Sequence, residues 1–399
     1  MTIVARYLCI MIQIKDKSLI ADYIICFAVF IQSALLIMQS VMVALLGIDP
    51  EETTLFRVLF TAIPMVAAIV ISFYRNPYLF LVVYAVVLII LALHSVLFPQ
   101  NAEFIWKEAP RFLLPVVIPS ALCLISVKKS EIVEKVAIFI SWVTAAMVSI
   151  YVAAFFRGVF IFERYNMSFG YGCLFPMMML YSCKRPFPIL ASFLIFLIVV
   201  ALGSRGASLV FVGYVFVDLF LSRNRFRWLV LSFGVLSILL LPLFESSLES
   251  IGITSRTLSH LEDGNITQSV GRESLYPFFI NQLMNNPITG IGIYGDRIDT
   301  DGTYCHNLLL EVLLDFGLLI GTIVLICLGL LIIRTFSRLK GRDRNLYLVF
   351  VFYGLGPLMA SSSYLRVNYL ALLIGFSFVL LRRIEAFHRE SNSCILHEK

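Results

Sequence analysis

The sequence predicts an all-α, polytopic membrane protein. Of its 399 residues, 60% are hydrophobic and 14% are charged, whereas soluble domains average roughly half and roughly a quarter. Apolar runs follow one another with short interruptions up to residue 245. A hydrocarbon core about 30 Å thick is crossed by about 20 helical residues. Because lipid-facing backbone must satisfy its own hydrogen bonds, we expect these runs to be helices.

The apolar runs predict about twelve transmembrane helices within one integral membrane domain, residues 1–399. They fall near residues 19–47, 55–74, 77–98, 111–127, 136–156, 166–183, 187–203, 206–222, 228–244, 307–333, 346–361 and 367–381. The least distinct pair flanks "ALGSRGASLV", where two runs could be one long helix. We expect residues 245–306 to form a large external loop between the ninth and tenth helices.

The positions of lysine and arginine favour twelve helices with both termini in the cytoplasm. Cytoplasmic loops are enriched in these residues. With the N-terminus inside, alternation through twelve spans places most of the 31 basic residues on the cytoplasmic side. The loops concerned are "QIKDKS", "FYRNP", "VKKSEIVEK", "CKRPF", "SRNRFR", "RTFSRLKGRDR" and "LRRIEAFHRE". Fusing the two runs around Arg205 would break this pattern.

The basic residues left on the external side are arginines with one exception. They are Arg57, Lys107, Arg111, Arg157, Arg164, Arg205, Arg256, Arg272, Arg297 and Arg366. A planar guanidinium binds phosphate in a bidentate way, which an ammonium cannot do. This bias predicts an anionic ligand on the external face; the alternative is that each arginine merely extends to the membrane interface.

Arg205 is the least ordinary of these arginines. It stands between two apolar runs with almost no loop around it. A charge inside a helix bundle is costly unless it has a partner or lines a wet cavity, so it indicates a functional site. Ser204 adds a hydroxyl, and the flanking glycines leave the backbone open to a ligand.

The external loop ends in a segment with several chemically useful residues. "RESLYPFFINQLMNN" predicts an amphipathic helix at the membrane surface. "NPITGIGIYG" predicts a Pro/Gly turn, and "DRIDTDGTYCHN" leads back to the membrane. Arg272 begins the helix, Arg297 follows the turn and His306 ends the loop. One segment therefore carries two guanidinium groups and one titratable base.

This segment resembles the bacterial O-antigen polymerase and O-antigen ligase superfamily. The resemblance rests on "VGRESLYPFFINQLMNNPITGIGIYG", "CHNLLLEVLLDFGLLIG" and the earlier "SRG", and covers roughly residues 203–321. It implies a glycosyltransferase that uses a glycan linked by pyrophosphate to undecaprenol, at the outer face of the cytoplasmic membrane. By this resemblance the catalytic residues are His306, Arg205 and Arg272. Arg297 has no firm counterpart in the family.

The chemistry of such a transfer suits these residue types. Arginines can stabilise the departing diphosphate, and a histidine can deprotonate the acceptor hydroxyl as general base. A single displacement of this kind inverts the anomeric carbon. We expect further substrate contacts from the external polar residues Arg297, Arg164, Arg157, Ser204, Asn307 and Glu311.

We expect no metal or other cofactor. The eight cysteines lack metal-ligand spacing. Asp299 and Asp301 have the DxD spacing of a metal site, but turns rich in Asp and Gly are common. The arginines already offer the positive charge, and retained activity in EDTA would check this expectation.

The helix after His306 carries polar residues on one face. Asn307, Glu311 and Asp315 recur every four residues. Carboxyl groups in a membrane helix are unlikely to face lipid. Our hypothesis is that Glu311 pairs with an external arginine or holds the loop in place; the alternative is a buried salt bridge without a catalytic role.

Three functions fit these features. A surface polysaccharide polymerase joins lipid-linked repeat units, and a ligase transfers the glycan to the lipid A core. The short cytoplasmic loops, the divergent first half, Arg157 and Arg164 favour the polymerase. A lipid-glycan flippase is the non-enzyme alternative, but it is expected to show internal repeats, and none is evident. The partners expected are the lipid-linked oligosaccharides, the bilayer and a chain-length regulator, with no nucleic acid.

Overall fold

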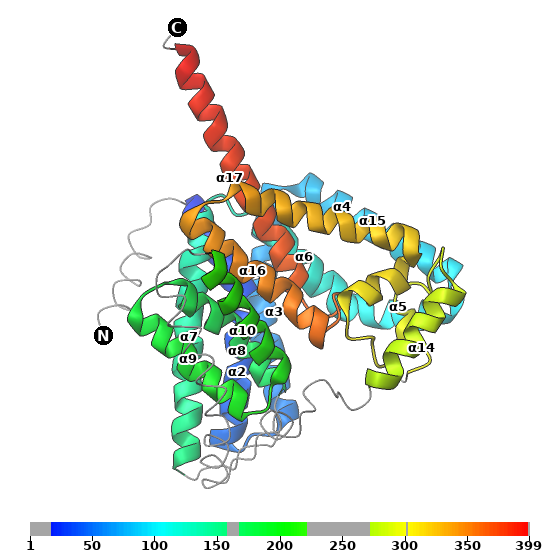
Figure 1. Cartoon of the computed structure of the whole chain (residues 1–399), viewed down its shortest axis with the longest axis horizontal. Coiled ribbons are helices and arrows are strands. Elements are labelled where there is room, and N and C mark those ends of the chain that lie inside the picture. The colour runs from blue at the N-terminus through cyan, green and yellow to red at the C-terminus, as the bar shows by residue number, and fades with distance from the viewer. Residues whose placement is uncertain (1–16, 158–166, 222–271, 301, 398–399) are drawn as a thin grey trace.

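The computed structural model describes residues 17–157, 167–221, 272–300 and 302–397, and in these residues it contains helices and no strand (Figure 1). The elements are α2 (Lys17–Leu46), α3 (Pro50–Arg75), α4 (Pro77–Leu97), η1 (Pro99–Asn101), α5 (Ala102–Glu108), η2 (Ala109–Val117), α6 (Ile118–Ile125), α7 (Ser130–Phe156), α8 (Met167–Ser182), α9 (Pro186–Ala201), α10 (Arg205–Leu221), α14 (Arg272–Asn285), η3 (Gly295–Arg297), α15 (Leu308–Arg338), α16 (Gly341–Ala360) and α17 (Tyr369–His397). The all-α prediction is confirmed.

Each predicted span within the described residues coincides with a helix, and the predicted span 228–244 lies outside them. Six helical stretches of the described chain are long and apolar enough to cross a membrane: Lys17–Leu46, Glu52–Arg75, Pro77–Leu97, Pro99–Ile125, Ser130–Phe156 and Leu308–Arg338. The chain is therefore a multi-pass membrane protein. The total of twelve spans and the extent of the external loop stay predictions.

The core lies between α2, α7, α8, α10 and α16 (Figure 1). Three phenylalanines from distant parts of the sequence meet at its centre. Phe30 stacks on Phe175 with ring centroids 5.2 Å apart, and Phe350 packs edge-on against both, at 6.0 and 5.7 Å. Such aromatic packing contributes beyond the buried area. It joins the N-terminal half of the chain to α16, whose C-terminal end carries part of the candidate site.

The "SRG" segment separates two helices, as predicted. α9 ends at Ala201 and α10 begins at Arg205. Gly203 has a φ of 74°, a left-handed conformation that glycine adopts at no steric cost. The apolar runs on either side of Arg205 are therefore distinct helices.

The helix ends that the sequence assigns to the cytoplasm lie on one face of the bundle. Arg75 pairs with the buried carboxylate of Asp22 at 2.5 Å, and the backbone N–H groups of Lys128 and Lys129 donate to the same carboxylate. Further ion pairs and hydrogen bonds on this face are Arg342–Glu134, Arg383–Asp343 and the Arg382 contact with the Ile125 carbonyl. The loops that make these contacts thus group as alternation requires, whereas "SRNRFR" lies outside the described residues. Their location in the cytoplasm stays a prediction.

The Pro/Gly turn after α14 docks into a break in α15. The span predicted near residues 307–333 is present as α15, but it is interrupted: Gly317 has φ 75° and ψ 173°, far from helical values. The turn satisfies the backbone groups that the break exposes. The Leu318 N–H donates to the Pro287 carbonyl, and the Ile291 N–H donates to the Leu314 carbonyl, both at 2.7 Å. Hydropathy cannot locate this break, because the residues around Gly317 form a continuous apolar run and only the glycine indicates it.

We expect Gly317→Ala to destabilise the protein, whereas Gly329→Ala should not. A Cβ at position 317 would lie 2.0 Å from the Ile288 carbonyl oxygen, and the positive φ is itself unfavourable for alanine. A Cβ at Gly329, in the same helix, meets nothing within 4 Å. The expected loss for position 317 is about 2 kcal/mol or more. Thermal unfolding of the two purified variants in detergent measures the difference, and equal melting temperatures would contradict the docking role.

Candidate active site

His306 lies in the segment between η3 and α15, and its ring is held in one orientation. The Nδ1 atom lies 3.1 Å from the carbonyl oxygen of Ser361, and the ring packs on Tyr304 with centroids 4.2 Å apart. The Tyr304 hydroxyl donates to the same carbonyl at 3.1 Å. Because a carbonyl oxygen only accepts, Nδ1 carries the proton in the neutral ring and Nε2 is the basic nitrogen.

The backbone of His306 is also unusual. Its φ of 58° is in the left-handed region, where residues other than glycine are uncommon. Such conformations cluster at functional sites, because the surrounding structure must hold them. Here Asn307 caps α15: its side-chain oxygen accepts from the N–H groups of Leu309 and Leu310 at 3.0 and 3.2 Å. His306 is thus fixed at the start of a capped helix.

The structure brings Arg205 to the same end of α16. Gly206, its neighbour in α10, packs against the last residue of α16: a Cβ built on Gly206 would lie 3.6 Å from that of Ala360. The next residue, Ser361, holds His306 through its carbonyl. The predicted catalytic residues Arg205 and His306 therefore both lie beside the C-terminal end of α16, although they are far apart in the sequence.

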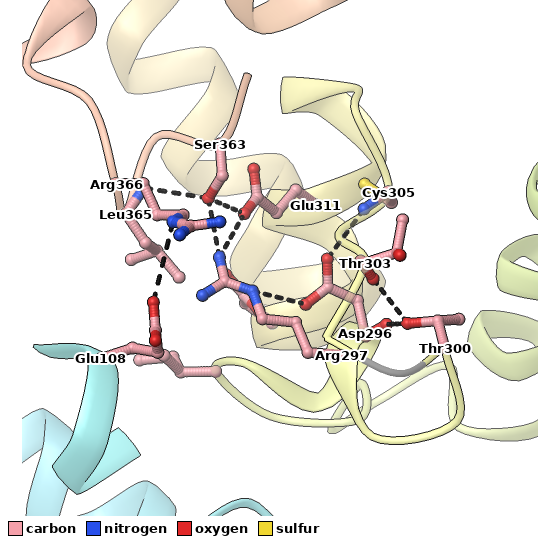
Figure 2. A network of polar contacts seen from close by, with 12 residues as sticks. Glu108, Asp296, Arg297, Thr300, Thr303, Cys305, Glu311, Ser363, Leu365 and Arg366 are labelled. Carbon is pink, nitrogen blue, oxygen red and sulfur yellow. Dashed lines mark hydrogen bonds and ion pairs between the residues drawn. The ribbon is translucent and has the colours of Figure 1, made fainter. Parts of the chain in front are cut away.

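A buried polar network includes Cys305, the residue before His306 (Figure 2). The Arg297 Nη2 donates to the Ser363 hydroxyl at 2.9 Å and lies 3.7 Å from Glu311 Oε1. The Ser363 hydroxyl donates in turn to Glu311 at 2.5 Å, and the Tyr364 N–H donates to the same carboxylate at 3.4 Å. The side chains of Arg297 and Glu311 are 2% and 0% exposed. The predicted pairing of Glu311 with an external arginine is thus observed, and its partner is Arg297.

Asp296 joins this network to Cys305, the residue before His306. Its Oδ1 lies 3.7 Å from the Arg297 Nε, and its Oδ2 accepts from the Cys305 N–H at 2.9 Å. Burial raises the pKa of the Asp296 carboxyl, and Arg297 and the Cys305 N–H oppose that rise. Burial also raises the pKa of the Cys305 thiol, which keeps it protonated. The thiol is buried and donates to the Asn307 carbonyl at 3.3 Å.

The carboxylates of α15 anchor the segment after α16. Glu311 and Asp315 lie on one buried face of the helix, as predicted, and Asp315 accepts from the Tyr364 hydroxyl. Residues 361–366 are thereby tied to both η3 and α15. Because this segment includes the Ser361 carbonyl, the network determines where the His306 ring sits.

For the other predicted site residues, the described part of the structure gives no contact with His306. Arg272 is the first residue of α14, and its side chain is not among those that the structure describes. Ser204 is buried, and its hydroxyl has no hydrogen-bond partner among the described residues. Arg157 is exposed at the end of α7 and forms no hydrogen bond or ion pair with the described residues around His306. Arg164 lies outside the described residues.

α14 nevertheless lies close to His306. Its buried residues Phe279 and Leu283 pack with Cys305 and Leu314, which flank the start of α15. The predicted helix of the external loop is confirmed by its position, residues 272–285. It brings the chain that follows Arg272 against the residue next to His306.

Only one residue of the DxD pair lies within the described residues. Asp299 is exposed and accepts from the Gln282 amide at 3.3 Å, while Asp301 lies outside the described residues. Within the described ranges there is no group of three or more His, Cys, Asp or Glu side chains that could hold a metal ion. Metal independence of the activity stays a prediction.

Three residues near the C-terminal end of the chain organise the site and were not predicted from the sequence. Ser361, Ser363 and Tyr364 belong to "SSSYLR", a short polar stretch between two apolar runs. Its signal was present: three serines, a tyrosine and an arginine at an external helix end. No periodicity linked it to residues 296–311, and only the tertiary contacts do so.

Comparison with known families agrees with this site. Residues 190–326 match the family model described as O-antigen ligase. The matched region includes Arg205, Arg272, Arg297, His306 and Glu311. No curated protein and no solved structure matches the chain significantly. This match supports the resemblance to the O-antigen polymerase and ligase superfamily that the sequence motifs indicated.

Proposed function

We propose that the protein is a membrane glycosyltransferase that polymerises a surface polysaccharide from oligosaccharide units linked by pyrophosphate to undecaprenol. The observation that carries this proposal is the hydrogen bond from His306 Nδ1 to the Ser361 carbonyl. It leaves Nε2 as a base at a site that also includes Arg205, and such a pair suits the activation of a hydroxyl beside a diphosphate.

The reaction is a single inverting displacement. The acceptor hydroxyl oxygen attacks the anomeric carbon of the donor while the bond from that carbon to the diphosphate oxygen breaks. His306 Nε2 takes the hydroxyl proton, and the diphosphate leaves with the bonding electron pair. Arg205 and Arg272 stabilise the charge that develops on the leaving group. No metal is invoked, and the reaction is expected to continue in EDTA.

Arg297 and Glu311 have a different role in this proposal. Both side chains are buried and bonded to each other or to Ser363. They act as positioning residues that hold the 361–366 segment, rather than as substrate ligands. Asn307, whose side-chain oxygen caps α15, likewise positions His306. Direct contact with substrate is assigned to His306, Arg205 and Arg272.

We expect Arg205→Ala to reduce transfer by a factor of about 100 to 1,000, the loss typical of removing one donor to a developing negative charge. Arg205→Lys should restore little of it, because an ammonium lacks the bidentate geometry. Initial rates with membranes containing equal amounts of each variant measure the effect. Full activity of the lysine variant would show that charge alone is needed.

The ligase reaction is the second candidate, favoured by the description of the matching family. Deletion of the gene separates the two. Loss of the polymerase leaves a surface glycan of single repeat units, whereas loss of the ligase leaves bare lipid A core and accumulated long lipid-linked chains. We place the active site at the outer face of the cytoplasmic membrane and both termini inside, and we expect a chain-length regulator as partner. A deletion strain with normal surface glycan would refute both candidates.

A further inference from the structure

Arg366 and Arg111 converge on one aromatic ring beside the candidate active site. The Arg366 guanidinium lies 4.9 Å from the Phe112 ring centroid, and the Arg111 guanidinium lies 5.5 Å from it. Arg366 also lies 5.8 Å from the ring of Tyr304. We propose that Arg366, Arg111, Phe112 and Tyr304 form a subsite for the anionic group of an acidic sugar, on the acceptor side of His306.

The contacts place this subsite next to the catalytic base. The Tyr304 ring that Arg366 approaches packs on His306, with centroids 4.2 Å apart. In an inverting displacement the base takes a proton from the acceptor, on the side of the sugar opposite the leaving diphosphate. Arg366 lies beside Tyr304, which packs on the base His306. We therefore place Arg366 on the acceptor side. This step rests on the proposed function; the binding of an anionic sugar does not.

The charge of Arg366 is available to a ligand. Its side chain is 38% exposed, and its ion pair with Glu108 is 3.7 Å long (Figure 2). The Arg366 guanidinium makes no hydrogen bond to any residue of the described chain. Glu108 is 14% exposed and supports the arginine from the protein side. Arg111 is exposed, so the two arginines outnumber the one carboxylate, and the guanidinium N–H groups can bind a carboxylate or phosphate.

The backbone that presents Arg111 and Phe112 is itself irregular. Both belong to η2, a nine-residue π-helical segment with Pro115 inside it. Such segments are rare and occur frequently at functional sites. The wider turn displaces consecutive side chains from the pattern of an α-helix. Here it brings Arg111 and Phe112 to the face where Arg366 lies.

The aromatic rings determine the kind of anion. Phe112 and Tyr304 are half-buried, and the part of each ring that the guanidinium groups and His306 leave uncovered suits the C–H face of a sugar ring. A free inorganic anion needs no such surface. The ligand chemistry is therefore a sugar that bears a carboxylate or a phosphate within reach of the reacting hydroxyl.

Ligand-observed NMR on the full-length protein in lipid nanodiscs tests the subsite, with glucose, methyl glucuronide and glucose 6-phosphate as probes. We expect at least one anionic probe to bind about tenfold more tightly than glucose, the effect of one charge-assisted hydrogen bond. The preferred probe distinguishes carboxylate from phosphate. Arg366→Ala and Arg111→Ala should each lose most of this preference, and Arg366→Lys should keep part of it. Arg338→Ala, which removes an exposed arginine at the far end of α15, should keep all of it.

Equal binding of the three probes to the wild type, or an unchanged preference in both alanine variants, would overturn the subsite. His306→Ala should bind the probes normally, so failure of the proposed reaction leaves this binding result standing. In the transfer assay, Arg366→Ala should raise the KM for the acceptor and leave the KM for the donor unchanged. A raised donor KM would overturn the assignment to the acceptor.

Discussion

We expect His306→Ala to abolish glycosyl transfer while the variant reaches the membrane in normal amounts. Removal of a general base typically costs a factor of about 100 to 10,000 in rate. The ring packs on Tyr304 and bonds the Ser361 carbonyl at the start of α15, outside the main hydrophobic core, so we expect its loss to affect folding less than chemistry. Initial rates of chain extension with a defined lipid-linked repeat unit, in membranes of matched protein content, measure the effect.

His306→Asn is the sharper variant. The asparagine amide can donate to the Ser361 carbonyl as Nδ1 does, but it offers no basic nitrogen in place of Nε2. We therefore expect it to fold as well as the wild type and to be as inactive as the alanine variant. Substantial transfer by either variant would refute the general-base role and leave His306 with a structural one.

Arg297→Ala is expected to be the most destabilising single change in the site. Its guanidinium is 2% exposed and lies 3.7 Å from both Glu311 and Asp296. Removing it leaves two buried carboxyl groups without a cation, and breaking a buried pair in this way costs about 3 to 5 kcal/mol. Fluorescence-detected size exclusion and thermal unfolding in detergent should show little folded protein.

The double variant Arg297→Met, Glu311→Gln is the control. Glutamine keeps the shape of Glu311 and still accepts from the Ser363 hydroxyl, so one of the two buried carboxyl groups is neutralised, while Asp296 keeps its hydrogen bond from the Cys305 N–H. We expect the double variant to recover part of the stability that Arg297→Ala loses. Its kcat should fall while its KM for the donor stays unchanged, because the pair positions His306 through Ser363. A raised donor KM would instead make Arg297 a substrate ligand.

The sequence determined the class of protein, the positions of the helices and the chemical character of the site. Hydropathy located the long apolar helices of the described chain, because burial in lipid requires long apolar runs. It did not locate the short helices η1 and α5, residues 99–108. The four-residue spacing of Glu311 and Asp315 correctly placed both on one buried face. Arg205 and His306 were identifiable because a polar residue at the edge of an apolar run is costly unless it has a function.

Only the tertiary structure decided how these parts fit together. The Ser361 carbonyl fixes the tautomer of His306 across 55 residues of sequence, and Ser363 joins Arg297 to Glu311 across a similar distance. The break in α15 at Gly317 exists because the Pro287 and Ile291 backbones supply its hydrogen bonds. Such contacts leave no periodicity and no compositional signal in the sequence. They arise from packing between distant segments, which the order of residues along the chain does not display.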